Sequence, residues 1–294
     1  MNDSLVRSVE DIERSLWLQW HWDAGVLLFL GALAACYFYG IGPLRRRYNL
    51  GEPATSAQVA LFISVIALIF VTLVSPLDAI GNNYLFSAHI TQAFLLTTVV
   101  PPLLLKSLPD WLLNPLFRWP PLRRRVRGLS FLMLATLLFN ATFMLWLIPS
   151  LYNAAVQSAP MHDFQNLTFL LTGIINWWPL VTPLRDGPRW AQPVQLLYLF
   201  LDGIPLGLLC VILFFVDHSL YSVYDHAPRL WGISILADLQ LGSIILYVPG
   251  LFIDMAVLSV IFFKWLAHQE AEARKREEAE DAEQATSPEA VKPA

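Results

Sequence analysis

Two histidines, each followed three residues later by a glutamine, are the side chains in this sequence best suited to binding chemistry. They form His89-Ile-Thr-Gln92 and His162-Asp-Phe-Gln165. Residues three apart share one face of a helix, so each pair directs an imidazole and an amide the same way. Imidazole suits copper, zinc, iron and nickel, and Met161 beside His162 would add a soft ligand for Cu(I). The same spacing also fits histidines that hydrogen-bond to neighbouring helices without any metal.

The composition places these pairs in a membrane protein. Of the 294 residues, 56% are hydrophobic and only 14% are charged, and the mean hydropathy is +0.53. The apolar residues form long runs, each near or above the roughly 20 residues that a helix needs to cross a bilayer. We therefore predict an all-α, polytopic membrane protein, a bundle of seven transmembrane helices near 24–43, 57–75, 85–105, 129–148, 164–182, 193–216 and 233–263.

Three parts of the chain differ in composition. Residues 1–22 form an amphipathic segment whose Trp17, Trp20 and Trp22 suit a membrane surface. This opening is acidic and polar where a signal peptide needs a cationic region, so the first apolar run is expected to be a retained span. Residues 23–266 form the membrane domain. Residues 267–294 form a charged tail that is expected to continue the last helix briefly and then become disordered.

Lysines and arginines predict the orientation. Sixteen of the nineteen fall in the loops after the first, third and fifth runs or in the tail, against three on the other side. The positive-inside rule then places the amino terminus outside and the carboxyl terminus inside. The sixteen are Arg45, Arg46, Arg47, Lys106, Arg118, Arg123, Arg124, Arg125, Arg127, Arg185, Arg189, Lys264, Arg274, Lys275, Arg276 and Lys292; the three are Arg7, Arg14 and Arg229.

This topology gives three ligand-type side chains a similar depth. His89 lies about four residues into the third run and Asp238 about five into the seventh, so both sit roughly 6–8 Å below the outer boundary. His162 lies at the mouth of the fifth run, and Asp78 falls on the same side. His21, His218 and His226 also fall on the outer side, whereas His268 falls inside.

Two acids, Asp202 and Asp254, lie deeper inside apolar runs. Intramembrane acids can mark a proton or ion path. They can also be satisfied locally, Asp202 near the helix break at Pro205 and Asp254 by protonation or a neighbouring donor. Asn140 and Asn176 are expected to hydrogen-bond between helices. A transporter is thus one hypothesis. A catalyst is the weakest, since no redox CxxC, nucleophile elbow or HExxH motif is present.

Three blocks of the sequence resemble a known family. SPLD with LFSAHITQAFLLTTVVPPLLL, then HDFQNLTFLLTGIINWWPL, and then LYSVYDHAPRLWGISILADLQLGSIILYVPG are similar to the seven-span CtaG membrane proteins, which assemble haem-copper cytochrome c oxidases. The resemblance implies a non-enzymatic assembly factor in the bacterial inner membrane. It implies help with copper delivery or insertion from the extracytoplasmic side. Its implied partners are oxidase subunits, a soluble extracytoplasmic copper chaperone and membrane lipid, with no nucleic acid.

The resemblance also implies a metal site, which this chain carries in depleted form. The family's blocks read His-x-x-Gln-His, His-x-x-Glu-His and Asp-Gln-Gln, whereas this chain has Ala93, Gln165, Asn166 and Leu239 at four of those positions. The remaining set could hold low-coordinate Cu(I), or the copper function could be lost while a scaffold persists. The implied ligands are His89, His162, Asp238 and Met161, with Gln92, Gln165 and Asp78 orienting them.

Overall fold

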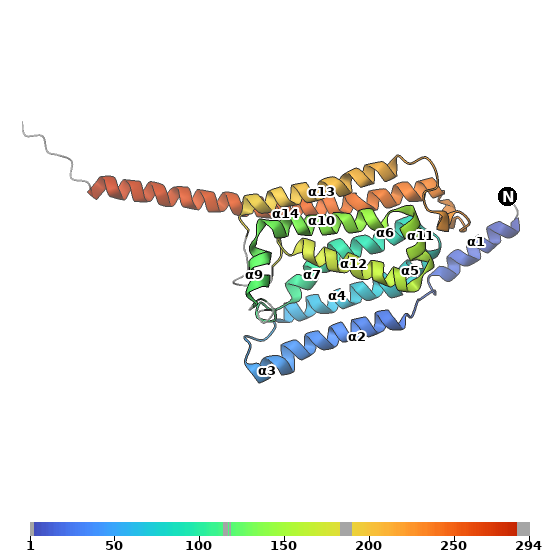
Figure 1. Ribbon diagram of the computed structural model, residues 1–294, viewed down its shortest axis with the longest axis horizontal. Coiled ribbons are helices and arrows are strands. Elements are labelled where there is room, and N and C mark those ends of the chain that lie inside the picture. The colour runs from blue at the N-terminus through green and yellow to red at the C-terminus, as the bar shows by residue number, and fades with distance from the viewer. Residues whose placement is uncertain (1–2, 114–116, 118, 183–189, 287–294) are drawn as a thin grey trace, which may run out of the picture.

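The computed structural model describes residues 3–113, 117, 119–182 and 190–286. Throughout these residues the regular structure is helical, with no strand, which confirms the all-α prediction. Figure 1 shows the long helices lying alongside one another in a bundle, with short helices across both ends. Arg118, Arg185, Arg189 and Lys292, which were counted for the orientation, lie outside the described residues.

Each predicted apolar run contains a long helix of the bundle. Two of these helices change pitch along their length: the first continues through a π-helical turn, η1, and the third contains another, η2. In chain order the long elements are α2 (Ala24–Tyr39) with η1 (Gly40–Leu44) and α3 (Arg45–Tyr48), α4 (Ser56–Val74), α6 (Phe86–Phe94) with η2 (Leu95–Val99) and α7 (Val100–Ser107), α10 (Leu129–Trp146), α12 (Ala159–Trp177), α13 (Gln192–Phe214) and α14 (Ile235–Thr286).

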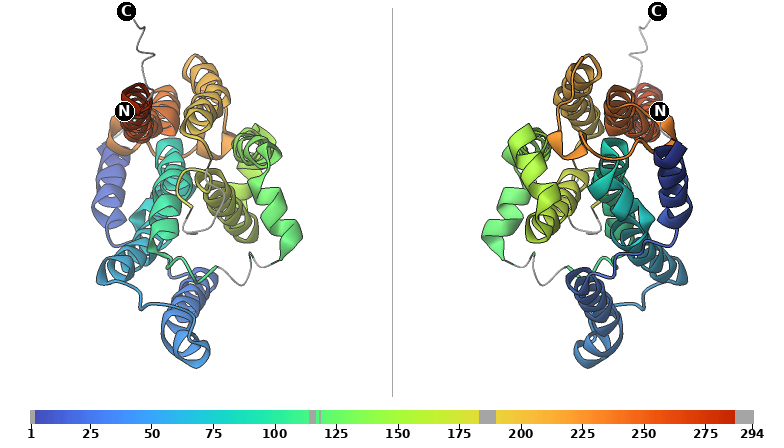
Figure 2. Two further views of the ribbon diagram at one scale, coloured as in Figure 1. Left: turned by 90° about the vertical axis from the view of Figure 1, so that its left-hand side faces the viewer. Right: turned by 90° about the vertical axis from the view of Figure 1, so that its right-hand side faces the viewer.

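Within the described ranges, six helices are long and apolar enough to cross a membrane, and α12 is not among them. Its apolar content is lowered by His162, Gln165, Asn166 and Asn176, all of which are buried. Figure 2 shows α12 between α7 and α10, and Phe164, Leu167 and Leu171 on its other face are exposed. The buried polar side chains of α12 therefore face protein, and its exposed apolar side chains are the ones that match lipid.

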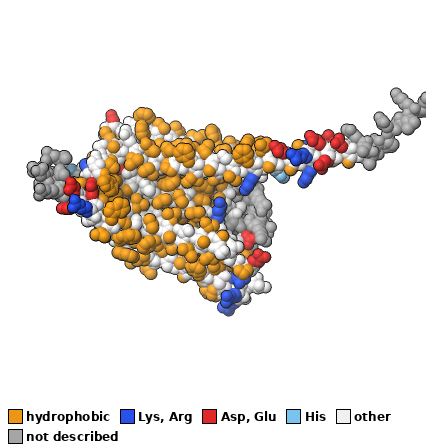
Figure 3. All heavy atoms as spheres, turned by 180° about the vertical axis from the view of Figure 1, so that it is seen from behind, with side chains coloured by type: hydrophobic (Ala, Val, Ile, Leu, Met, Phe, Trp, Pro, Cys, Tyr) orange, Lys and Arg blue, Asp and Glu red, His pale blue; other side chains and the backbone are white. Residues whose placement is uncertain are grey.

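The outside of the bundle has the character of a membrane-facing surface. Large apolar side chains are exposed along the helices, among them Met133 on α10, Phe200 on α13 and Phe252 on α14. Figure 3 shows hydrophobic side chains covering the length of the bundle, with charged side chains gathered toward its ends. An exposed apolar belt of this extent requires lipid around it. The chain is therefore a multi-pass membrane protein.

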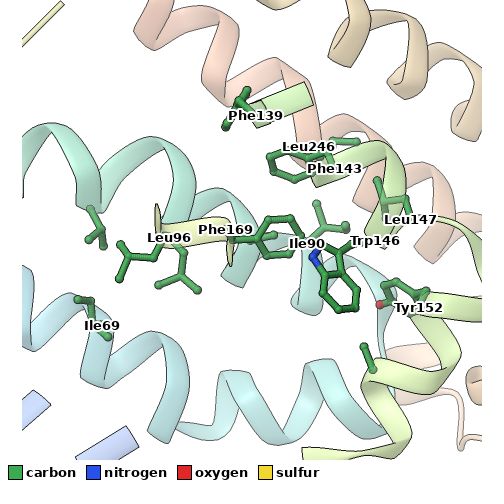
Figure 4. Close-up of a cluster of buried hydrophobic side chains, with 14 of the residues drawn as sticks. Ile69, Ile90, Leu96, Phe139, Phe143, Trp146, Leu147, Tyr152, Phe169 and Leu246 are labelled. Carbon is green, nitrogen blue, oxygen red and sulfur yellow. The ribbon is translucent and has the colours of Figure 1, made fainter. Parts of the chain in front are cut away.

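The core joins most of the long helices. Figure 4 shows Ile69 of α4, Ile90 of α6, Leu96 of η2, Phe143 of α10 and Phe169 of α12 among its members, and all five are buried in one cluster. Close packing of α12 on η2 depends on a glycine. A Cβ added to Gly173 would lie 2.8 Å from the Thr97 carbonyl oxygen.

Short elements close the two ends of the bundle. We call one the histidine end; it carries α1 (Asp3–Leu16), α5 (Pro76–Asn83), α11 (Pro149–Gln157), η3 (Ser222–Tyr224) and η4 (Leu230–Gly232). The opposite end, called the arginine end, carries α3 and α9 (Pro120–Arg127). These two short helices contain seven of the arginines that predicted the orientation.

The last helix is longer than the sequence suggested. We expected a brief continuation after residue 266, but α14 runs on to Thr286 and projects beyond the arginine end (Figure 1). The tail is rich in Ala, Glu, Lys and Arg, which favour helix even without packing. His268 Nε2 also lies 3.3 Å from Glu272 Oε1, one turn along. Residues 287–294 lie outside the described residues.

Candidate functional site

The two predicted histidines meet inside the bundle. The ring centroids of His89 on α6 and His162 on α12 lie 5.3 Å apart. The residues are only 2% and 8% exposed. Gln92 and Gln165 lie about one helical turn further along the same faces and are each 1% exposed. The shared depth predicted from the sequence therefore corresponds to direct contact between the two His-x-x-Gln motifs.

Three atoms of these motifs are buried without a hydrogen-bond partner. They are His89 Nδ1, Gln92 Oε1 and Gln165 Oε1, although the Gln165 side chain lies near enough to His89 to interact with its ring. Leaving one such group unpaired in an interior costs about 1–3 kcal/mol, so native proteins rarely keep several together without a ligand, ion or water. Imidazole nitrogen binds transition metals, and an amide oxygen is a weaker, harder ligand. Two imidazoles bridged through bonds of about 2.0 Å would have centroids roughly 5–6 Å apart, which the observed separation fits.

Asp238 accepts hydrogen bonds from the first residues of α6. Its Oδ2 accepts a 2.7 Å hydrogen bond from the Phe86 amide, and its Oδ1 accepts bonds from the Ser87 amide at 3.0 Å and the Ser87 hydroxyl at 2.5 Å. The side chain of Leu85, the residue that precedes α6, makes no capping hydrogen bond to the helix. Asp238 therefore caps α6 from α14, one turn before His89, and satisfies amides that would otherwise be unpaired.

The histidines and Asp238 do not form a ready-made metal cluster. Among the described residues, no three His, Cys, Asp or Glu side chains are grouped as ligands. Met161 packs partly buried against the hydrophobic core. Ala93 and Leu239, where the resemblance implied a histidine and a glutamine, are core residues. The structure thus brings together the histidine pair, both glutamines and Asp78, whereas Asp238 and Met161 make the other contacts described above.

Asp78 connects the glutamine of α6 to a histidine outside the bundle. Its Oδ1 accepts hydrogen bonds from Gln92 Nε2 at 3.0 Å and from Asn82 Nδ2 at 3.1 Å. Its Oδ2 lies 3.1 Å from His21 Nδ1. Gln92 Nε2 also donates to the Thr72 carbonyl at 2.7 Å. Because both contacts occupy the amide nitrogen, they hold Gln92 Oε1 in the orientation that leaves it unpaired.

A polar pocket of about 370 Å³ gives access to this region from the histidine end. His162 forms part of its wall, whereas His89 lies behind it. Among the described residues that line the pocket there are three carboxylates and two histidines but no lysine or arginine. The lining residues are Gln19, Trp20, His21, Asp23, Val26, Leu73, Asp78, Ala79, Asn82, Asn83, Val156, Gln157, Ala159, His162, Asp163 and Asn166. This composition favours a cation.

A tyrosine pair supports the histidine from the other side. The His89 ring meets Tyr152 edge-on with centroids 5.0 Å apart. The Tyr152 and Tyr224 hydroxyls lie 2.8 Å apart, and Tyr224 donates a 2.6 Å hydrogen bond to the Gly81 carbonyl. Burial raises the pKa of both tyrosines, so they remain neutral. Sequence reasoning did not select these tyrosines, although Tyr224 lies in a block that carried the resemblance.

Asp202 is satisfied by neighbouring helices. Asn140 Nδ2 donates to its Oδ1 at 3.2 Å, and Asn176 Nδ2 donates to its Oδ2 at 2.7 Å. Tyr198 donates to Asn176 Oδ1 at 2.5 Å. The predicted interhelical role of both asparagines is confirmed, and Asp202 joins α10, α12 and α13. Asp254 lies half-buried on α14.

Together, the apolar bundle and its buried histidine pair define a polytopic helical membrane protein with a candidate cation site at one end. A family model described as cytochrome c oxidase caa3 assembly factor matches residues 35–268. The chain belongs to this family, as the resemblance predicted. No curated protein and no solved structure matched the chain. His21 and the rest of the amino-terminal segment precede the matched region.

Proposed function

We propose that this protein assists the assembly of a haem-copper cytochrome c oxidase by holding copper as cargo between His89 and His162. One observation carries the proposal: two imidazoles from different helices contact each other in the interior, next to polar atoms that have no protein partner. The family match supports a cytochrome c oxidase as the enzyme whose assembly is assisted. The role is that of a non-enzymatic carrier, so reversible binding is what the site must achieve.

In this proposal the histidine end faces the extracytoplasmic space. The arginine end carries Arg45, Arg46, Arg47 and Arg124, and the positive-inside rule assigns such an end to the cytoplasm. The amino terminus is then outside and the carboxyl terminus inside a bacterial inner membrane. Seven crossings are needed for this arrangement, with α12 as the fifth, because its polar side chains face protein.

The depleted ligand set suits a transient carrier of Cu(I). His89 and His162 would supply two nitrogen ligands, and the amide oxygens of Gln92 and Gln165 would be weak additional donors. The Asp78–Gln92 hydrogen bond fixes one of these amides, and such supporting contacts typically change metal affinity by about 10–100-fold. A low-coordinate ion is held by few bonds, so it can be passed to an oxidase subunit. A soluble copper donor would load the site from the same side.

The test is a Cu(I) competition titration on detergent-purified protein. We compare the parent with His89→Ala, His162→Ala and the control His218→Ala, whose ring is exposed and paired with Asp217. Binding that is lost in the first two variants and kept in the third supports the proposal. No binding in the parent would remove copper carriage and leave a scaffold role. Zn²⁺ is titrated alongside, because imidazole alone does not select copper.

A deletion strain tests the link to the oxidase. Loss of the protein should lower cytochrome c oxidase activity, and added copper should partly restore it. Complementation with the double variant His89→Ala/His162→Ala should fail at low copper. Full complementation by that variant would show that the protein supports the oxidase without carrying copper.

A further inference from the structure

His21 is a histidine at the pocket mouth that the proposed carrier site does not use. Its side chain is 56% exposed, whereas the side chain of its partner Asp78 is 4% exposed. Its Nδ1 lies 3.1 Å from Asp78 Oδ2. A carboxylate in this position holds Nδ1 as the protonated nitrogen, so the lone pair of Nε2 is available to a cation.

The buried site needs such an entrance. His89 is 2% exposed and absent from the pocket lining, whereas His162 lines the pocket and contacts His89, so entry from this pocket to His89 passes His162. His21 and His162 line the same pocket. Asp78 and Asp163, which also line it, lie close enough to His162 to act on its charge. A cleft lined by carboxylates concentrates cations at this point.

The His21 side chain is not required to fasten the segment that carries it. The His21 backbone amide already donates to the Val74 carbonyl at 2.9 Å. Asp23 caps α2 by accepting from the Val26 amide at 2.9 Å, and the Trp20 and Trp22 rings pack on Phe70. The imidazole therefore adds a ligand at the pocket mouth to a segment that is held by other contacts.

We propose that His21, oriented by Asp78, is the capture ligand that takes an incoming Cu(I) ion at the pocket mouth and hands it to His162 and His89. The step is a ligand exchange: the bond from copper to His21 Nε2 breaks as a bond to His162 forms, with no change in oxidation state. This inference rests on the proposed carrier function. It adds an entry site in a segment that lies outside the family match.

Transfer kinetics separate capture from storage. Parent protein in detergent is mixed with a coloured Cu(I) chelate, and the loss of chelate absorbance gives both the rate and the final extent of transfer. We expect His21→Ala to slow transfer about tenfold, within the range of focusing effects on association, with an unchanged final extent. The matched control His218→Ala, another exposed histidine of the same end, should transfer at the parent rate.

His21→Gln distinguishes a ligand from a tether. The glutamine amide can still donate a hydrogen bond to Asp78 but lacks the imidazole lone pair. If His21 is a copper ligand, this variant should transfer copper slowly. If His21 only fastens the segment to Asp78, the variant should transfer copper at the parent rate, and that result would overturn the inference. An equal loss of final extent in both His21 variants would make His21 a permanent ligand and would also overturn it. If the parent takes up no copper, the proposed function fails first and the capture role falls with it. Equal thermal midpoints would confirm that the variants fold.

Discussion

Replacing Asp238 tests whether this carboxylate is a helix cap or a metal ligand. Asp238→Ala removes the acceptors of three hydrogen bonds, two of them from the first backbone amides of α6. Asp238 is 4% exposed, so water cannot easily replace it. Hydrogen bonds to a charged group contribute about 1.5–3 kcal/mol each, and removing one partner of a buried charged network typically costs about 3–5 kcal/mol. We expect a destabilisation of about 3–5 kcal/mol for alanine and roughly half for asparagine, which keeps one acceptor.

The measurement is thermal unfolding in detergent, followed by circular dichroism, with Asp217→Asn as the control. Asp217 is exposed at the same end, with a side chain that is 95% accessible, and its replacement should leave the midpoint unchanged. Copper affinity is measured below the midpoint of each variant. A small loss of stability together with a complete loss of copper binding would refute the capping argument and restore Asp238 as a ligand.

Three further predictions follow from single contacts. Gly81→Ala should weaken copper binding, because its Cβ would lie 2.9 Å from Gln92 Oε1 and 3.0 Å from the His89 amide, whereas Gly31→Ala, with nothing within 4 Å, should bind normally in the same titration. Burial raises the pKa of Tyr224 above its ordinary value of 10.0. The contribution of Tyr224 to stability is therefore complete below about pH 10 and declines as the pH rises through the raised pKa. Tyr224→Phe should cost about 1–3 kcal/mol of stability at neutral pH and should weaken the loss of stability at high pH, both measured in melting curves. Asn176→Leu removes the 2.7 Å bond to Asp202 and should lower the thermal midpoint without changing copper affinity; a normal midpoint would mean that Asp202 has other sufficient partners.

The structure agrees with the sequence in being all-helical and multi-pass among the described residues. Long apolar runs predicted the helices because a bilayer requires about 20 apolar residues per crossing. The fifth run was the weakest candidate for a membrane span, since α12 carries buried polar residues that lower its hydropathy. The long extension of α14 was underestimated, because charged residues suggested disorder while their helix propensity favours continuation.

The sequence by itself determined that His89 and His162 each have a glutamine one turn away, because helical geometry fixes this relation locally. The similar depth of the two histidines was a prediction from the topology. Only the tertiary structure decided that the two rings meet, that Asp238 caps α6 from α14, and that Asp78 connects Gln92 to His21. These contacts join residues far apart in the chain. They depend on which helices become neighbours, and helix neighbours are chosen by packing across the whole core, which the periodicity of a single helix does not encode.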